Sequence, residues 1–264
     1  MKDKDRLDKL LPELGLAETR AKAQALIMAG KVRVNGQVIT KSGSMYERGI
    51  NITVDDVPKW AGRGALKLLR AFEVFGLDVA GKTCADFGAS TGGFTDVMLA
   101  HGAKKVYAVD VGYGQLIWRL ANDSRVTVMD RTNARYLTRS DFPEEIEFAG
   151  CDVSFISLRL ILPVLDDVVS SDAVVLIKPQ FEAGRDRISR GVIRDKAIHA
   201  EVIEEILRFI RYNTRFKIDG LTYSPVRGQE GNIEFLCHIT HDGEDKNFSV
   251  NDIVDEAHEN TGSD

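Results

Sequence analysis

Short apolar runs and helical apolar stripes alternate along the chain from about residue 82 to residue 239. The runs have the length of strands, and the segments between them carry apolar residues three or four positions apart. This alternation predicts an α/β fold with a mostly parallel sheet, because parallel strands need helical connections. We expect seven strands in a doubly wound sheet. The last two, about 216–223 and 232–239, are joined by a short loop, so one of them is expected to be antiparallel.

The first 57 residues follow a different pattern, which predicts a small α+β domain. A helical stripe opens the chain and is formed by Leu7, Leu10, Leu11 and Leu14. A second helix is expected over about residues 18–29. The Asn35-Gly36 pair then predicts a tight hairpin, and residues 50–54 supply a further strand.

Charge divides the chain into modules. The 264 residues are 44% hydrophobic and 28% charged, which are values of a globular protein. Residues 1–60 hold 11 Lys and Arg against 8 Asp and Glu, whereas residues 242–264 hold 1 against 8. We therefore expect a basic first domain, a linker at 58–63, a nearly neutral body at 64–241, and a solvated, flexible acidic tail.

The cysteines and the N-terminus point to the cytoplasm. Cys84, Cys151 and Cys237 lie far apart in apolar stretches, so they are expected to be buried free thiols. The first residues carry no apolar signal region, and no apolar run approaches the roughly 18 residues that a membrane span needs. The scattered histidines form no zinc motif, so neither a metal nor membrane attachment is expected.

Five expected strands end in a charged residue, and these residues are Asp86, Asp110, Asp130, Asp152 and Lys178. Because the carboxyl ends of parallel strands line the ligand crevice of such sheets, we expect these side chains to share one site.

A glycine-rich turn follows the first of these strands. It reads Asp86-Phe87-Gly88-Ala89-Ser90-Thr91-Gly92-Gly93-Phe94. Glycines let the backbone approach a ligand, and Asp110, 22 residues after Gly88, is well placed for ribose hydroxyls. The dinucleotide fingerprint and the P-loop motif are both absent.

This turn resembles motif I of class I S-adenosylmethionine-dependent methyltransferases, which have a Rossmann-like sheet. The resemblance implies cofactor contacts from Asp86, Gly88, Ser90, Thr91, Gly92, Gly93, Phe94 and Asp110. Asp130 is expected near the adenine, although the segment Asp130-Arg131-Thr132-Asn133 is also compatible with an ordinary polar turn.

The candidates for the chemistry are two lysines and two carboxylates, Lys67, Asp152, Lys178 and Glu234. The place after the fourth strand lacks the Asn/Asp-Pro-Pro motif of amino-methylating enzymes, and Cys151 lies in an apolar run that does not activate a thiol. A lysine can deprotonate a ribose hydroxyl if burial and a second ammonium lower its pKa. One of the two lysines would then be the base, and the other would lower the pKa of that base. The alternative is a set of surface ion pairs of little consequence.

In chain order these four residues resemble the Lys-Asp-Lys-Glu tetrad of FtsJ-like ribose 2′-O-methyltransferases. Together with Arg63-Gly64-Ala65 before Lys67, and with Pro179-Gln180-Phe181-Glu182 after Lys178, they resemble the TlyA-type, or haemolysin A, family of rRNA methyltransferases. This resemblance covers about residues 4–240. It implies methylation of a ribose 2′-oxygen, in cytidine of ribosomal RNA within ribosomal subunits. In that reaction we expect Lys178 to be the base and Lys67 to lower its pKa.

The first domain resembles the alpha-L RNA-binding domain in its Gly15-Leu16-Ala17, Thr19-Arg20 and Asn35-Gly36 segments, with Thr19 where that family usually has Ser. The resemblance implies RNA contacts from the basic residues Arg6, Arg20, Lys22, Lys31, Arg33, Lys41 and Arg63. On charge alone these residues also fit a solvated face. Two other functions remain open, a ribosome-assembly factor with a vestigial methyltransferase fold and a pore-forming haemolysin. The oligomeric state is open as well.

Overall fold

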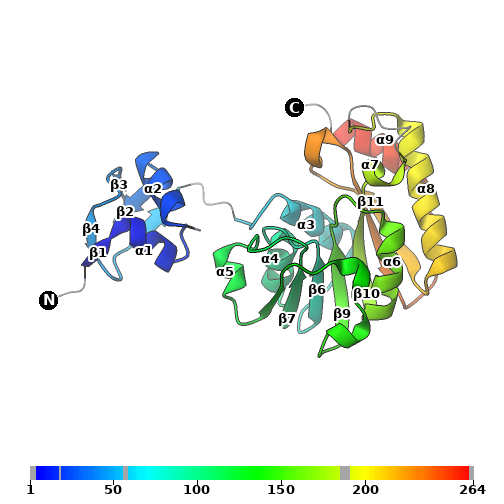
Figure 1. The fold of residues 1–264 in the computed structure, drawn as a ribbon. Helices are drawn as coiled ribbons and strands as arrows, with labels where there is room; N and C mark the ends of the chain where they lie inside the picture. The colour runs from blue at the N-terminus through cyan, green and yellow to red at the C-terminus, as the bar shows by residue number, and fades with distance from the viewer. Residues whose placement is uncertain (1–3, 18, 56–58, 185–190, 262–264) are drawn as a thin grey trace. The chain divides into compact units, whose positions relative to one another are not determined.

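The computed structural model describes residues 4–17, 19–55, 59–184 and 191–261 (Figure 1). These residues form two compact units. The first consists of residues up to 59 together with 117–123, and the second consists of 60–116 and the chain from 124 onward. The expected linker begins at Pro58, which lies outside the described residues, and Arg63 at its end is the N-cap of a helix.

The first unit packs two helices against small antiparallel sheets. Its elements are β1 (Lys4–Arg6), α1 (Leu7–Glu13), α2 (Arg20–Met28), β2 (Val32–Val34), β3 (Gln37–Ile39), β4 (Met45–Glu47) and β5 (Ile52–Val54). The strand order is β3-β2-β5 in one sheet, and β1 pairs with β4 in another. Thr19 caps α2, because its Oγ1 accepts a hydrogen bond from the Lys22 backbone N–H at 3.2 Å. The α+β expectation for this unit is confirmed, whereas the β1–β4 pair was not expected.

The second unit is built on the expected seven-stranded sheet. Its strands are β6 (Thr83–Phe87), β7 (Lys105–Val109), β8 (Val126–Met129), β9 (Ile146–Cys151), β10 (Val169–Ile177), β11 (Lys217–Tyr223) and β12 (Phe235–Thr240). Their order is β11-β12-β10-β9-β6-β7-β8. Only β12 runs antiparallel to its neighbours, β10 and β11. The doubly wound α/β expectation is therefore confirmed, and the antiparallel strand is the last one.

Helices cover both faces of this sheet (Figure 1). The helices of this unit are α3 (Gly64–Phe75), α4 (Gly93–Ala100), α6 (Leu162–Val168), α7 (Pro179–Glu182), α8 (Lys196–Asn213) and α9 (Val250–Asn260), with single turns at Ala134–Tyr136, Arg139–Asp141, Leu158–Leu160 and Gln229–Gly231. The short helix α5 (Trp118–Ala121) belongs to the first unit. Phe72 of α3 contacts the ring of Phe148 on one face of β9. The neighbouring Ala149 and Cys151 face the opposite core, which α6, α8 and α9 supply.

The expectation of a flexible acidic tail is wrong. Residues 250–260 form the helix α9, and Val250, Val254 and Ala257 are buried in the core beside α8. These three residues recur at helical spacing, so they form an apolar stripe on a helix whose other faces are acidic. The expectation of a flexible tail rested on the net charge of the segment, and net charge does not reveal such a stripe. The last expected tail residues, 262–264, lie outside the described residues.

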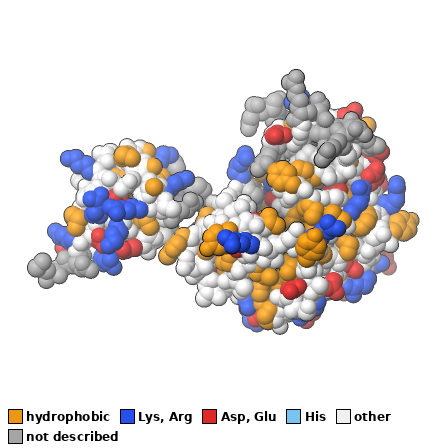
Figure 2. All heavy atoms as spheres, in the orientation of Figure 1, with side chains coloured by type: hydrophobic (Ala, Val, Ile, Leu, Met, Phe, Trp, Pro, Cys, Tyr) orange, Lys and Arg blue, Asp and Glu red, His pale blue; other side chains and the backbone are white. Residues whose placement is uncertain are grey.

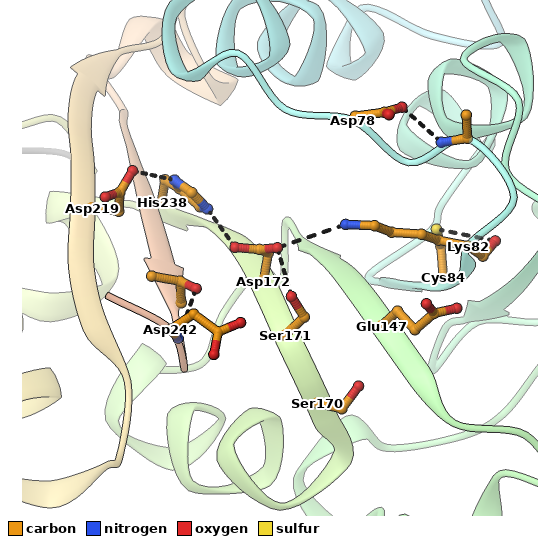
Figure 3. Close-up of polar contacts among 12 residues, drawn as sticks. Asp78, Lys82, Cys84, Glu147, Ser170, Ser171, Asp172, Asp219, His238 and Asp242 are labelled. Carbon is orange, nitrogen blue, oxygen red and sulfur yellow. Dashed lines mark hydrogen bonds and ion pairs between the residues drawn. The ribbon is translucent and has the colours of Figure 1, made fainter. Parts of the chain in front are cut away.

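A polar network lies at the end of the sheet where the strands β6, β10 and β11 begin (Figure 3). His238 of β12 places its two ring nitrogens 3.1 Å from Asp172 Oδ1 and 3.2 Å from Asp219 Oδ2. Burial raises the pKa of Asp172, but hydrogen bonds from His238, Ser171 and Thr240 outweigh burial and hold that pKa at about 2. Asp172 is therefore ionised, and the network joins β10, β11 and β12 on the side of the sheet opposite the carboxyl ends of the parallel strands.

The three cysteines are free and buried, as expected. Burial raises the pKa of each thiol to about 12, so none of them is an activated nucleophile. No helix within the described part of the chain has both the length and the apolar character to cross a membrane.

Candidate active site

The four residues expected to carry the chemistry line one cavity of about 290 Å³. Lys67 comes from α3, Asp152 follows β9, Lys178 follows β10, and Glu234 precedes β12. The cavity thus opens at the carboxyl ends of the parallel strands, where ligand sites of such sheets lie. Sheet order explains the convergence, because β9 and β10 are neighbours and β12 lies next to β10.

The four side chains form a continuous chain of charges. Lys178 Nζ lies 2.6 Å from Asp152 Oδ1, and Lys67 Nζ lies 3.0 Å from Asp152 Oδ2. Lys67 Nζ also lies 2.8 Å from Glu234 Oε2. Asp152 therefore stands between the two lysines, with one oxygen on each. Two lysines and two carboxylates thus pair with one another, as a buried cluster of charged groups requires.

This cluster is buried. Lys67, Lys178 and Glu234 are 8%, 5% and 2% exposed. Burial lowers the pKa of Lys67, but the carboxylates of Asp152 and Glu234 outweigh burial and hold that pKa above its usual value. Lys67 is therefore a fixed cation, and the idea of unimportant surface pairs does not fit this geometry.

Two polar side chains that sequence reasoning did not select complete the cluster. Ser154 Oγ accepts a hydrogen bond from Lys178 Nζ at 2.8 Å, and Gln180 Nε2 donates to Glu234 Oε1 at 3.2 Å. Both residues lie two positions beyond a selected residue, Asp152 or Lys178. That spacing was the available signal for them.

Two glycines permit the close packing around the cluster. A Cβ at Gly228 would overlap Oε1 of Glu234, so only glycine leaves that carboxylate in place. A Cβ at Gly88 would lie 2.8 Å from the carbonyl oxygen of Asp152, and Gly88 has a φ of +87°. Gly88 was expected to contact the cofactor, and the structure gives it this packing role as well. Gly228 was not selected.

The glycine-rich turn folds against the end of β7. Asp110 accepts hydrogen bonds from the backbone N–H groups of Ser90 at 2.8 Å and Gly112 at 2.7 Å. Asp130, at the end of β8, accepts from the Gly114 N–H at 2.9 Å. Both carboxylates thus hold loops at the strand ends. Of the residues expected to bind cofactor, the lining of the 290 Å³ cavity contains Asp86, Gly88, Ser90, Thr91, Gly93 and Phe94, but not Gly92, Asp110 or Asp130.

Asp86 is a buried carboxylate with one unused oxygen. Its Oδ2 accepts from Thr95 N at 2.8 Å and Thr95 Oγ1 at 2.7 Å, which holds the first turn of α4. Its Oδ1 is buried and has no hydrogen-bond partner among the described residues. Burial raises the pKa of Asp86 to about 7, against the lowering effect of Thr95, and the charges of Asp152 and Asp110 raise it further.

Several basic residues of the first unit already have acidic partners. Arg6 and Arg20 lie 2.8 Å and 3.3 Å from Oδ2 of Asp8, whose side chain is fully buried. Arg33 lies 2.8 Å from Asp55. Figure 2 shows Lys and Arg side chains gathered on this unit with acidic side chains among them. Each of these arginines therefore already has a carboxylate partner in its own unit, and they remain 41–56% exposed.

The remaining basic candidates lie at the surface or near it. Lys22 and Lys41 are exposed, and Lys31 is half-buried. Arg63 is exposed and lines the 290 Å³ cavity of the second unit. The structure therefore brings Arg63 to the candidate active site and leaves the other six in the first unit.

Comparisons with known proteins agree with this architecture. A family of FtsJ-like methyltransferases matches residues 60–240, and the S4 domain matches residues 5–49. The 16S/23S rRNA (cytidine-2′-O)-methyltransferase TlyA of Mycobacterium tuberculosis is 41% identical over 96% of each chain. Hemolysin A of Brachyspira hyodysenteriae is 43% identical over 89% of this chain and 99% of its own. A solved structure from Streptococcus thermophilus, described as a hemolysin candidate, is 43% identical with a TM-score of 0.73 and covers 98% of both chains.

Proposed function

The chain belongs to the FtsJ-like methyltransferase family and carries an S4 domain, and from this premise we propose that it methylates ribosomal RNA. The methyl donor is S-adenosylmethionine, and the acceptor is a ribose 2′-oxygen, in cytidine, within ribosomal subunits. One observation carries the proposal, the buried chain of Lys178, Asp152, Lys67 and Glu234 beside the glycine-rich turn. A protein that acts on ribosomal subunits works in the cytoplasm.

The residues around the turn fit the donor. S-adenosylmethionine supplies a methyl group that its sulfonium has already activated. Its amino acid end carries an ammonium, and Asp86 Oδ1 is a buried acceptor that lacks a donor among the described residues. Asp110 and Asp130 stand at the ends of the next two strands, where a ribose and an adenine are held in sheets of this kind. Gly88, Gly93, Ser90, Thr91 and Phe94 line the cavity together with Asp86.

Lys178 is the proposed base. Its Nζ is oriented by Asp152 Oδ1 and Ser154 Oγ, and in its neutral amine form it takes the proton from the RNA 2′-hydroxyl. Lys67, fixed between Asp152 and Glu234, places a positive charge beside the oxygen as its negative charge develops. Asp152 and Glu234 orient the two lysines. Because the methyl group needs no further activation, positioning and deprotonation do most of the work.

The basic residues of the S4 domain are the proposed RNA-contacting set, and they are Arg6, Arg20, Lys22, Lys31, Arg33 and Lys41, with Arg63 at the active site. The arginines that pair with Asp8 or Asp55 keep much of their surface exposed, so a phosphate can still approach them. RNA binding is therefore expected to weaken as salt rises.

Methyl transfer to separated ribosomal subunits tests the proposal. Native protein and Lys178→Ala are incubated with S-adenosylmethionine labelled in its methyl group, and label is located in the RNA. We expect label on a ribose 2′-oxygen, and a rate about 10²–10⁴-fold lower for Lys178→Ala. Calorimetric binding of the donor to both proteins is the control. Unchanged turnover of Lys178→Ala would refute its role. Donor binding without label on any subunit would favour a non-catalytic assembly factor.

A further inference from the structure

A second cavity, of about 920 Å³, adjoins the candidate active site in the second unit. The two cavities share part of their linings, namely Arg63, Val226, Arg227 and Gly228. A polymer that leaves the first cavity on this side therefore enters the second. One wall is formed by the end of α9, through His258, Asn260 and Thr261.

The lining of this second cavity is cationic. Three guanidinium groups converge on it from distant parts of the chain, Arg63 at the start of α3, Arg194 before α8, and Arg227 in the loop after β11. Glu230 is the single acid among its described lining residues. Arg63 and Arg194 are exposed, and neither forms an ion pair with a residue that the structure describes.

Arg227 is held in a fixed position. Its Nε donates to the Thr261 carbonyl at 2.6 Å, and its Nη1 donates to the Gly231 carbonyl at 2.8 Å. A guanidinium carries five N–H donors in a rigid plane, so donors remain after these two bonds. Both bonds go to neutral carbonyl groups, so the positive charge of Arg227 is not neutralised by them. A rigid, unneutralised guanidinium is well suited to bind an anion.

We propose that the second cavity binds the phosphodiester backbone of the RNA strand adjacent to the methylated nucleotide. This inference rests on the proposed function, because it requires a ribose of RNA in the first cavity. A ribose in a strand is joined to phosphates on both sides. Because the two cavities share part of their linings, a phosphate next to the ribose in the first cavity lies near Arg63, Arg194 and Arg227 of the second. Arginine guanidinium groups bind phosphate oxygens whatever the base sequence is. This cavity therefore positions the strand so that the ribose to be methylated lies at Lys178.

The experiment compares two charge reversals at exposed arginines. Arg194→Glu alters the cavity, and Arg208→Glu, on an exposed position of α8 outside the lining, is the matched control. Binding to purified ribosomal RNA is measured by filter retention across a salt series, without the methyl donor. We expect Arg194→Glu to weaken binding about tenfold and to reduce the slope of log affinity against log salt by about 0.7–0.9 for each phosphate that the variant no longer neutralises. Arg194→Lys should restore most of the affinity.

Methyl transfer separates this role from a structural one. When the RNA concentration is varied up to saturation, Arg194→Glu should raise KM for RNA and leave kcat and donor binding near native values. If Arg194→Glu matches Arg208→Glu in affinity and salt slope, the inference is overturned even when native protein methylates RNA. If Arg194→Glu loses donor binding instead, the cavity serves the fold or the donor, which also overturns it. Conversely, a native protein that binds RNA through Arg194 but transfers no methyl group would overturn the proposed function alone.

Discussion

Replacing Asp86 with Asn should reveal the energetic cost of the buried carboxylate in the donor site. Asp86 is 1% exposed, and only one of its oxygens is hydrogen-bonded within the described residues. Burial raises its pKa from 3.8 to about 7. Asn has nearly the same shape, and its Oδ1 can accept both hydrogen bonds from Thr95. The substitution therefore removes the charge and leaves the packing of α4 intact.

The sign of the effect follows from which state holds the proton more tightly. The folded state binds a proton on Asp86 more strongly than the unfolded state does, so the free energy of unfolding decreases as pH rises from about 4 to about 7. A difference of about 3 pKa units corresponds to about 4 kcal/mol once pH exceeds the folded pKa. Between pH 5 and pH 8 the native protein should lose about 2–3 kcal/mol that Asp86→Asn does not lose.

Urea unfolding of the two proteins at pH 5 and pH 8, without donor, measures this difference. Groups common to both proteins cancel in the comparison. Asp195→Asn, which makes the same chemical change at the exposed N-cap of α8, is the control and should follow the native protein. Calorimetry should show that Asp86→Asn binds S-adenosylmethionine more weakly, because a neutral amide replaces the carboxylate. An equal loss of stability between pH 5 and pH 8 in native protein and Asp86→Asn would refute the reasoning.

Two further predictions concern the loop beside Glu234 and the packing of α9. Gly228→Ala should lower methyl transfer by about tenfold or more while donor binding is retained, because its Cβ would displace the Glu234 carboxylate that holds Lys67; native turnover would contradict this. Burial lowers the pKa of His199, which is hydrogen-bonded to His258 at 3.0 Å, to about 4. Its contribution to stability is present above about pH 6.5 and is lost as pH falls toward 4, so His199→Phe should flatten this part of a urea-unfolding pH profile, and an unchanged profile would exclude the effect.

Much of the fold and the core of the candidate site could be predicted from the sequence. Apolar runs that end in Asp86, Asp110, Asp152 and Lys178 are local patterns, and parallel sheets always bring such strand ends to one edge. The placement of Asp152 and Lys178 on one side of the sheet therefore needed no knowledge of the packing, whereas their contact depends on β9 and β10 being neighbours. Lys67 and Glu234 were candidates by residue type, and only the family resemblance grouped them with Asp152 and Lys178, because nothing local to either residue shows that they meet.

Other features depended on the tertiary structure. The fully buried Asp8 of the first unit holds Arg6, Arg20 and Gln24, and no spacing in the sequence predicts that cluster. The same holds for Arg227, which donates to the backbone carbonyls of Gly231 and Thr261. Every residue has a backbone carbonyl, so the sequence does not show which of them bind Arg227.

The C-terminal helix shows the physical reason most clearly. Net charge is an average over a segment, whereas burial depends on which few side chains face a complementary surface. Val250, Val254 and Ala257 form an apolar stripe, but the surface of α8 and β11 that covers it exists only in the folded chain. The sequence by itself thus determined the sheet, the turn and the strand-end charges. The tertiary structure decided that an acidic segment becomes one wall of a cationic cavity, because burial is a property of the packed molecule.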